Sequence, residues 1–298
     1  MKATASAQIM KKIFLTAMVM MLSWLAALNP SAARSATVAE DPSQDMPMED
    51  APHVSSFGKG ESPAYGDRIL FGSIGEASNL IPYLTSDSAS HEVADMLYVA
   101  PLRYNKDLQP EPWAAESWSM EEGGRLMRFT LRKGILWEDG QELTAEDVAF
   151  TYKLVIDPAT GSPYAEDFLR IKELRVLDRY TFEARYEQFF ARAVSSWMSP
   201  ILPKHILEGQ NIRETPFARK PVGAGPYRLK SWEPGSRITL TASPTYFDGK
   251  PHISEVVYRI IPDSATMFME TRAGRLDVMD LSPLQYLRQT SGPLWEEQ

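Results

Sequence analysis

Two adjacent pairs of acidic residues, Glu138-Asp139 and Glu146-Asp147, are the first candidates for chemistry in this chain. Two carboxylates that flank a sugar bond can perform glycoside hydrolysis, one as acid and the other as base or nucleophile. Neighbouring residues in a turn, or in the first turn of a helix, point apart. The sequence therefore favours a turn for the first pair and a helix N-terminus for the second, and not a hydrolase site.

Histidine and cysteine are the other residue types that could define a site, and the chain has four histidines and no cysteine. His53, His91, His205 and His252 are far apart in the sequence and show no metal-ligand spacing. The sequence also contains no His-Glu-x-x-His, Gly-x-Ser-x-Gly or P-loop pattern. We therefore expect no metal, no cofactor and no catalytic site, which makes binding the leading class of function.

Two glycines precede a short alternating run in the segment "KPVGAGPYRL" at residues 220–229. Gly223 and Gly225 permit a close approach of the backbone to its neighbours, and Pro226 fixes φ. Arg228 occupies the third glycine position of a dinucleotide fingerprint, so that motif is excluded. The segment is either a rigid platform that leads into a strand, or a simple bulge or turn.

Composition limits the possible classes of protein. The chain has 298 residues, a formal net charge of -8 and 31 basic residues scattered along it, which argues against a nucleic-acid partner. Its hydrophobic and charged fractions, 44% and 23%, are those of a soluble globular protein. Because 10% of the residues are aromatic, most rings must be buried, and we expect Trp113, Trp118 and Trp137 in the core.

The N-terminus has the pattern of a secretory signal peptide at residues 1–33. Lys11-Lys12 precede the apolar run Ile13 to Leu28, and small residues follow up to Ala33. A membrane anchor is the alternative, although the apolar run is shorter than a spanning helix requires. Residues 34–65 are acidic and rich in proline and serine, so we expect a disordered leader. Without cysteine, neither lipid anchoring at cysteine nor disulfides are possible.

Periodic patterns indicate the elements that position these motifs. An apolar run at Arg68 to Ile74 predicts a buried strand, and alternation at residues 127–132 predicts a half-buried one. Thr144 caps a helix that ends before Pro158. The other predicted elements are a helix at His91 to Tyr98; strands at 181–186, 227–229, 237–241 and 255–261, two of them joined by a turn at 233–236; a helix capped by Asp263 or Ser264 and ended by Gly274; and a short helix opened by Ser282-Pro283. This mixture predicts a mixed α/β architecture.

Three stretches, at residues 116–158, 221–251 and 269–279, resemble the extracytoplasmic solute-binding proteins of family 5. These are the oligopeptide- and dipeptide-binding components of ABC importers. The resemblance covers residues 66–290 in consistent order. Its most specific element is Trp-x-Asp-Gly-x-x-Leu-Thr-Ala-x-Asp-Val, which begins at Trp137.

The resemblance implies an α/β mixed, periplasmic-binding-protein type II-like clamshell. Of this clamshell we expect only lobe I, with its inserted subdomain, to be largely present, and the second lobe to be missing through a gene truncation or because the chain is a fragment. The expected segments are 66–99 and 201–282 in lobe I, 100–200 in the inserted α/β subdomain, and 283–298 at the start of the connection to the second lobe.

The resemblance also nominates ligand-binding residues. The loop "LIPYLTSDSAS" resembles the segment that pairs with the peptide backbone, and "DPATGSPY" contains the tyrosine that closes over the peptide. The ligand-binding candidates are Ser86, Asp87, Ser88 and Tyr164, and the cleft or hinge candidates are Gly223, Gly225 and Tyr227. The alternatives are a polar turn at Ser86 to Ser88, local packing of Tyr164 after Pro163, and core packing of Tyr227.

The implied function is a periplasmic solute-binding subunit that captures peptides and delivers them to an ABC permease complex in the inner membrane. An extended peptide carries regularly spaced donors and acceptors, so main-chain pairing binds many sequences. We expect a monomer that binds no nucleic acid. In the family that the chain resembles, the acidic residue that pairs with the peptide amino group lies in the second lobe, so we expect weak or no binding by this chain. The alternatives are another solute (nickel, haem or an opine), a non-binding remnant and an exported hydrolase.

Overall fold

The computed structural model describes residues 65–290. The predicted signal peptide and, apart from Tyr65, the predicted leader lie outside the described residues. Two four-stranded sheets and one two-stranded sheet organise the described part of the chain, which is mixed α/β as predicted.

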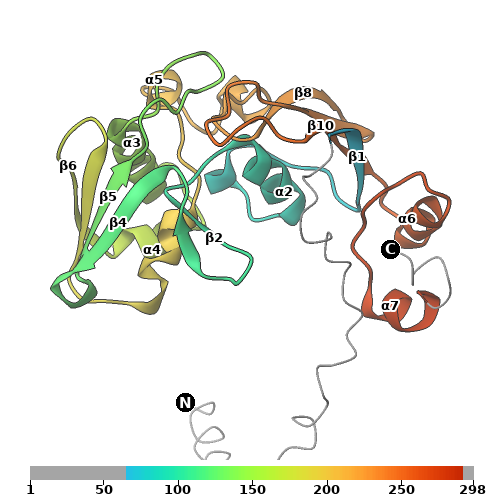
Figure 1. The fold of residues 1–298 in the computed structure, drawn as a ribbon, viewed down its shortest axis with the longest axis horizontal. Helices are drawn as coiled ribbons and strands as arrows, with labels where there is room; N and C mark the ends of the chain where they lie inside the picture. The colour runs from blue at the N-terminus through green and yellow to red at the C-terminus, as the bar shows by residue number, and fades with distance from the viewer. Residues whose placement is uncertain (1–64, 291–298) are drawn as a thin grey trace, which may run out of the picture. The chain divides into compact units, whose positions relative to one another are not determined.

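The first sheet has the strand order β1-β10-β9-β8. Its strands are β1 (Gly66–Ser73), β8 (Tyr227–Glu233), β9 (Arg237–Ala242) and β10 (Ile253–Ile260). β1 runs parallel to β10, whereas the other neighbours are antiparallel. On the free side of β1, the backbone N–H groups of Asp277 and Val278 both donate to the carbonyl of Leu70, at 2.9 and 3.1 Å. Helix α2 (Ser88–Leu97) lies beside this sheet (Figure 1).

The second sheet is antiparallel throughout, in the order β4-β5-β7-β6. Its strands are β4 (Ala115–Glu121), β5 (Leu126–Leu131), β6 (Ile171–Val176) and β7 (Thr181–Tyr186). Phe129 and Phe182 are cross-strand partners, and their rings stack with centroids 4.8 Å apart. Helix α3 (Ala145–Ile156) lies beside this sheet (Figure 1). The four strands of the second sheet thus lie in the sequence between β1 and the other three strands of the first sheet.

The start of α3 follows from its capping residues. Thr144 and Asp147 form a capping box, in which the Asp147 carboxylate accepts the Thr144 N–H at 2.8 Å. The same carboxylate accepts the N–H of Lys204 at 2.9 Å, so it also fixes the start of α5 (Lys204–Leu207). The helix ends at Ile156, before Pro158, as predicted.

The predicted strands and helices are all present, with shifted ends, but the prediction that the strand at Arg68 to Ile74 is buried was wrong. β1 is partly exposed along its length, because it is an edge strand whose free side is covered, among the described residues, only by the short backbone contact with residues 277–278. The N-cap of α6 (Ser264–Arg272) is Asp263, and a capping box at Ser282 opens α7 (Pro283–Gln289). The elements that were not predicted from the sequence are β2 (Leu102–Tyr104), β3 (Pro110–Pro112), β4, β6, α4 (Ala165–Leu169), α5 and the short 3-10 helices Pro82–Leu84, Glu122–Gly124, Ala191–Ala193, Ser195–Met198 and Pro216–Ala218.

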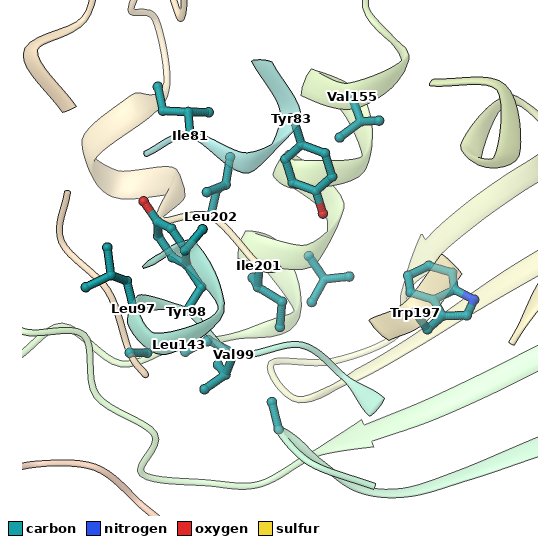
Figure 2. Packing of buried hydrophobic residues seen from close by; sticks show 14 of the residues in the cluster. Ile81, Tyr83, Leu97, Tyr98, Val99, Leu143, Val155, Trp197, Ile201 and Leu202 are labelled. Carbon is teal, nitrogen blue, oxygen red and sulfur yellow. The ribbon is translucent and has the colours of Figure 1, made fainter. Parts of the chain in front are cut away.

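A continuous hydrophobic core connects the elements around both large sheets. Figure 2 shows part of it, where Leu97 and Tyr98 from the end of α2 lie among Ile201, Leu202 and neighbouring side chains. Trp137 is completely buried, which confirms its predicted place in the core. The same prediction was too strong for Trp113 and Trp118, which pack against the core but are only partly buried. Trp113 keeps its indole N–H near the surface, where it donates to Tyr246 Oη at 2.8 Å.

Within residues 65–290, no helix has the length and apolar character needed to cross a membrane.

Candidate ligand-binding site

Asp87 organises the loop that precedes α2. It is the N-cap of the helix, and its Oδ1 accepts the N–H of Ser90 at 2.8 Å. Its Oδ2 accepts hydrogen bonds from the hydroxyls of Ser78, at 2.6 Å, and Thr85. Burial alone would raise the pKa of Asp87, but these hydrogen bonds lower it well below its usual value. The carboxylate is therefore ionised and fully engaged in shaping the loop.

Ser86 and Ser88 stand on either side of Asp87 and are both exposed. Ser88 is the first residue of α2, so its hydroxyl and backbone N–H lie at the positive end of the helix dipole. The loop thus presents polar groups to solvent while Asp87 holds it in shape.

Tyr164 lies against the same loop, although it comes from the segment that leads into α4. Its hydroxyl oxygen is 2.7 Å from His91 Nε2, and the two rings meet edge to face with centroids 5.6 Å apart. His91 is in the first turns of α2, and its N–H donates to the Asp87 carbonyl at 3.3 Å. Burial, and then the Asp87 carboxylate, raise the pKa of Tyr164. The fold therefore brings Tyr164 to the loop of Ser86 to Ser88. His91, which contacts both, was not nominated from the sequence.

A pocket of about 560 Å³ lies beside the start of α2. Its walls are the end of β1 with residues 74–76, the start of α2, helix α6 and the segment 280–285. Asp87 and Ser88 line the pocket, whereas Ser86 and Tyr164 do not. The lining residues are Gly72, Ser73, Ile74, Gly75, Glu76, Asp87, Ser88, Ala89, Glu92, Ser264, Met267, Asp280, Leu281, Ser282 and Gln285.

The charge of the pocket lining is entirely negative. Four carboxylates, those of Glu76, Asp87, Glu92 and Asp280, line the pocket, and no lysine, arginine or histidine is among the lining residues. Burial, followed by repulsion from Asp280 and Asp95, raises the pKa of Glu92. A ligand with a positive group would relieve this repulsion.

Gly223 and Gly225 lie at the other end of α2, against its last carbonyl. The N–H of Gly225 donates to Leu97 O at 2.9 Å. The helix has ten residues, which places Leu97 about 15 Å from Asp87. Tyr227 is buried, and its hydroxyl donates to the Ile253 carbonyl at 3.0 Å. These three residues pack the fold at a distance from the loop, and a hinge role for them stays a prediction.

Asp139, Asp147 and His205 contact other parts of the fold in ways that support its structure. Asp147 caps α3, as the sequence favoured, and Asp139 Oδ2 lies 2.6 Å from His205 Nε2. Glu138 lies in a turn, as the sequence favoured, and its side chain is half-buried. Among the described residues, no group of three or more histidine, aspartate and glutamate side chains is arranged to hold a metal ion.

Comparison with known proteins identifies the family. Residues 109–293 match the family model described as bacterial extracellular solute-binding proteins, family 5 Middle. The chain belongs to this family. It is 31% identical over 232 residues to the oligopeptide-binding protein AppA of Bacillus subtilis, a match that covers 75% of this chain and 42% of AppA. This member of family 5 therefore spans less than half the length of the curated relative that it matches.

Solved structures of family 5 proteins share its fold. AppA from Bacillus subtilis, solved in complex with a nonapeptide, has a TM-score of 0.71 and 29% identity, with 76% of this chain and 46% of AppA covered. DppA from Helicobacter pylori, in complex with the peptide STSA, has a TM-score of 0.69 and 26% identity, with 76% and 49% covered. MoaA from A. tumefacien R10, in complex with mannopinic acid, has a TM-score of 0.68 and 26% identity, with 76% and 47% covered. These similarities confirm the predicted fold class.

Proposed function

We propose that this family 5 protein is a peptide-capturing, solute-binding subunit of an ABC importer and has no catalytic activity of its own. The observation that carries the proposal is the meeting of Tyr164 with the α2 loop beside a 560 Å³ pocket, in a chain that is 31% identical to an oligopeptide-binding protein. Exposed hydroxyls at Ser86 and Ser88 offer hydrogen bonds to peptide main-chain groups.

The acidic pocket supports a ligand with a free amino group. A peptide carries an ammonium at its N-terminus, and the four carboxylates of the lining favour that charge. Another solute is the second candidate, because MoaA has the same fold and was solved with mannopinic acid. An acid of that kind would meet like charges in this pocket, so the lining favours a peptide over an anionic ligand.

The ligand would be delivered to a permease in the inner membrane. We expect the protein to reach the periplasm through a cleaved signal peptide and to act there as a monomer, without a nucleic-acid partner. The mass and N-terminal sequence of the protein recovered from a periplasmic fraction test the export step. A chain that starts at Arg34 is the expected result, and a chain that keeps residues 1–33 would contradict it.

Binding by this chain is expected to be weak. Each peptide hydrogen bond contributes about 1 kcal/mol, so three or four of them correspond to a Kd in the millimolar range. The test is a series of ¹H–¹⁵N correlation spectra of the full chain with trialanine added to about 10 mM. Saturable shifts at Ser86, Ser88 and Tyr164 are expected.

Controls for this titration separate the alternatives. N-acetylated trialanine lacks the ammonium and is expected to bind several-fold more weakly than trialanine if the acidic pocket takes that group. Absence of saturable shifts with trialanine would overturn peptide capture by this chain and favour the alternative of a non-binding remnant. Cleavage of trialanine in the same tube would instead support a hydrolase.

A further inference from the structure

His91 lies between two oxygen atoms from separate parts of the chain. Its Nε2 is 3.1 Å from the carbonyl oxygen of Thr85 and 2.7 Å from the hydroxyl oxygen of Tyr164. Tyr164 is 73 residues further along the chain than His91. The ring planes are at 88° to one another, so the imidazole meets both the hydroxyl and the edge of the phenol ring. The His91 side chain therefore joins the loop before α2 to the segment before α4, next to an edge contact between the rings of Tyr83 and Tyr164.

The two neighbours of Nε2 decide which atom carries the proton. A carbonyl oxygen can only accept a hydrogen bond, and an unprotonated Nε2 would place two lone pairs 3.1 Å apart. Nε2 therefore carries a hydrogen, in the neutral ring as in the charged one, and shares it between Thr85 O and Tyr164 Oη. The hydroxyl of Tyr164 is then an acceptor toward His91, and its own proton remains free.

The neighbouring carboxylate does not use that proton. Asp87 is the charged group that acts on Tyr164, but its oxygens already accept hydrogen bonds from Ser78, Thr85 and Ser90. Tyr164 is 37% exposed, so its hydroxyl proton is accessible from solvent. Asp95, which also interacts with His91, lies one turn further along α2.

We infer that His91 is a positioning residue that holds Tyr164 over the α2 loop and fixes its hydroxyl as a hydrogen-bond donor to a ligand carbonyl oxygen. The part of this inference that concerns the ligand rests on the proposed peptide function. Peptide carbonyl groups accept such a bond at every residue, whatever the side chain. Tyr164 would therefore favour ligands that carry a carbonyl acceptor and would not discriminate between peptide sequences.

The first test needs no ligand. Long-range ¹H–¹⁵N spectra of the histidine rings are recorded on the ligand-free full chain at about pH 8, where an ordinary histidine is neutral. The His91 signals are assigned by their loss in His91→Gln. The expected result is a protonated Nε2. An Nδ1–H ring with unprotonated Nε2 would overturn the inference.

The second test uses two variants that differ in reach. A glutamine amide nitrogen extends to the position of Nε2, whereas an asparagine amide extends only to that of Nδ1. His91→Gln is expected to bind trialanine within about 2-fold of the wild type, and His91→Asn and Tyr164→Phe are each expected to lose about 5-fold. The double variant His91→Asn/Tyr164→Phe is expected to be no weaker than Tyr164→Phe.

Two results would contradict the positioning role: wild-type binding by His91→Asn, or multiplied losses in the double variant. Thermal unfolding of each variant shows whether a loss arises from misfolding, and the ring spectrum of wild type is unaffected by that problem. If wild type does not bind trialanine while Nε2 is protonated, the peptide function fails and the positioning of Tyr164 by His91 stands.

Discussion

The N–H of Gly225 donates to the carbonyl of Leu97 at 2.9 Å, so the last turn of α2 is in direct backbone contact with the segment that leads into β8. A Cβ on Gly223 would lie 1.9 Å from the same carbonyl oxygen, and a Cβ on Gly225 would lie 2.7 Å from it. Neither glycine has a positive φ, so the requirement for glycine comes from this close approach.

Replacement of Gly223 by alanine is expected to destabilise the protein by about 3 kcal/mol or more, because a backbone atom cannot move aside as a flexible side chain can. Urea unfolding followed by circular dichroism measures the loss. Gly75→Ala is the matched control, since its nearest neighbour would be Ala89 Cβ at 3.9 Å. Equal stabilities of the two variants would show that α2 and the segment 223–225 can separate without loss.

Glu138 should make stability depend on pH. Burial raises the pKa of this carboxyl to about 7, although Arg228 and the backbone of Gly223 offset part of the effect. Its Oε1 is buried and, among the described residues, has no hydrogen-bond partner. Because the folded-state pKa is raised, the stability contributed by the protonated form is complete below about pH 4.5 and is lost as the pH rises through about 7.

Glu138→Gln is therefore expected to raise the free energy of unfolding at pH 8 by roughly 1–2 kcal/mol, with a difference that shrinks toward pH 5. Urea unfolding of both proteins across this range checks the sign. Glu146→Gln removes an exposed carboxylate and should show no such trend. If the difference in the free energy of unfolding between Glu138→Gln and the wild type grew toward acid pH, Glu138 would not be the source of the pH dependence.

Asp87 should have the opposite pH dependence. Hydrogen bonds from Ser78, Thr85 and Ser90 outweigh burial and lower its pKa, so its contribution is present above the unfolded pKa of about 4 and is lost as the pH falls through the folded value. Asp87→Ala is expected to lose about 2 kcal/mol at pH 7. In thermal unfolding, the difference in stability between Asp87→Ala and the wild type should be smaller at pH 3 than at pH 7. Ser88→Ala, at an exposed position, is the control and should show no such change with pH.

The adjacent residues Glu146 and Asp147 should respond very differently to mutation. Asp147 is buried and accepts the N–H groups of Thr144 and Lys204, whereas Glu146 is exposed and pairs with Lys204 Nζ at 3.0 Å. Asp147→Ala leaves two N–H groups without a partner and should cost about 2–3 kcal/mol. Glu146→Ala should cost under about 1 kcal/mol. Chemical unfolding at pH 7 measures both, and similar losses would refute the distinction.

Local patterns predicted the elements that have strong internal signals. Helix α3 was recognisable from the Thr144 cap and from Pro158, and the alternation at residues 181–186 matches β7. β4 was missed because it is an edge strand of polar sequence, AESWSME, whose residues are mostly exposed. The parallel pairing of β1 with β10 joins residues 187 apart, and no local pattern specifies such a partner.

The candidate site was predictable only in part for the same reason. The resemblance to family 5 nominated Asp87 and Tyr164 separately, but not the side chain that connects them. His91 shows only helical spacing from Asp87 in the sequence, and its contact with Tyr164 exists once the two segments have come together. The burial of Glu138 likewise depends on the distant segment at Gly223, whose carbonyl accepts the Glu138 N–H at 2.9 Å.

The pairing of β1 with β10 imposes an order on how the chain acquires its structure. The sheet of residues 115–186 is built from strands that are close in the sequence, so it can form while the chain is still being made. β1 waits for partners at residues 253–260 and 277–278, and closing so long a loop is slow. During synthesis the first sheet therefore lacks its β1–β10 pair until nearly the whole described chain has been made.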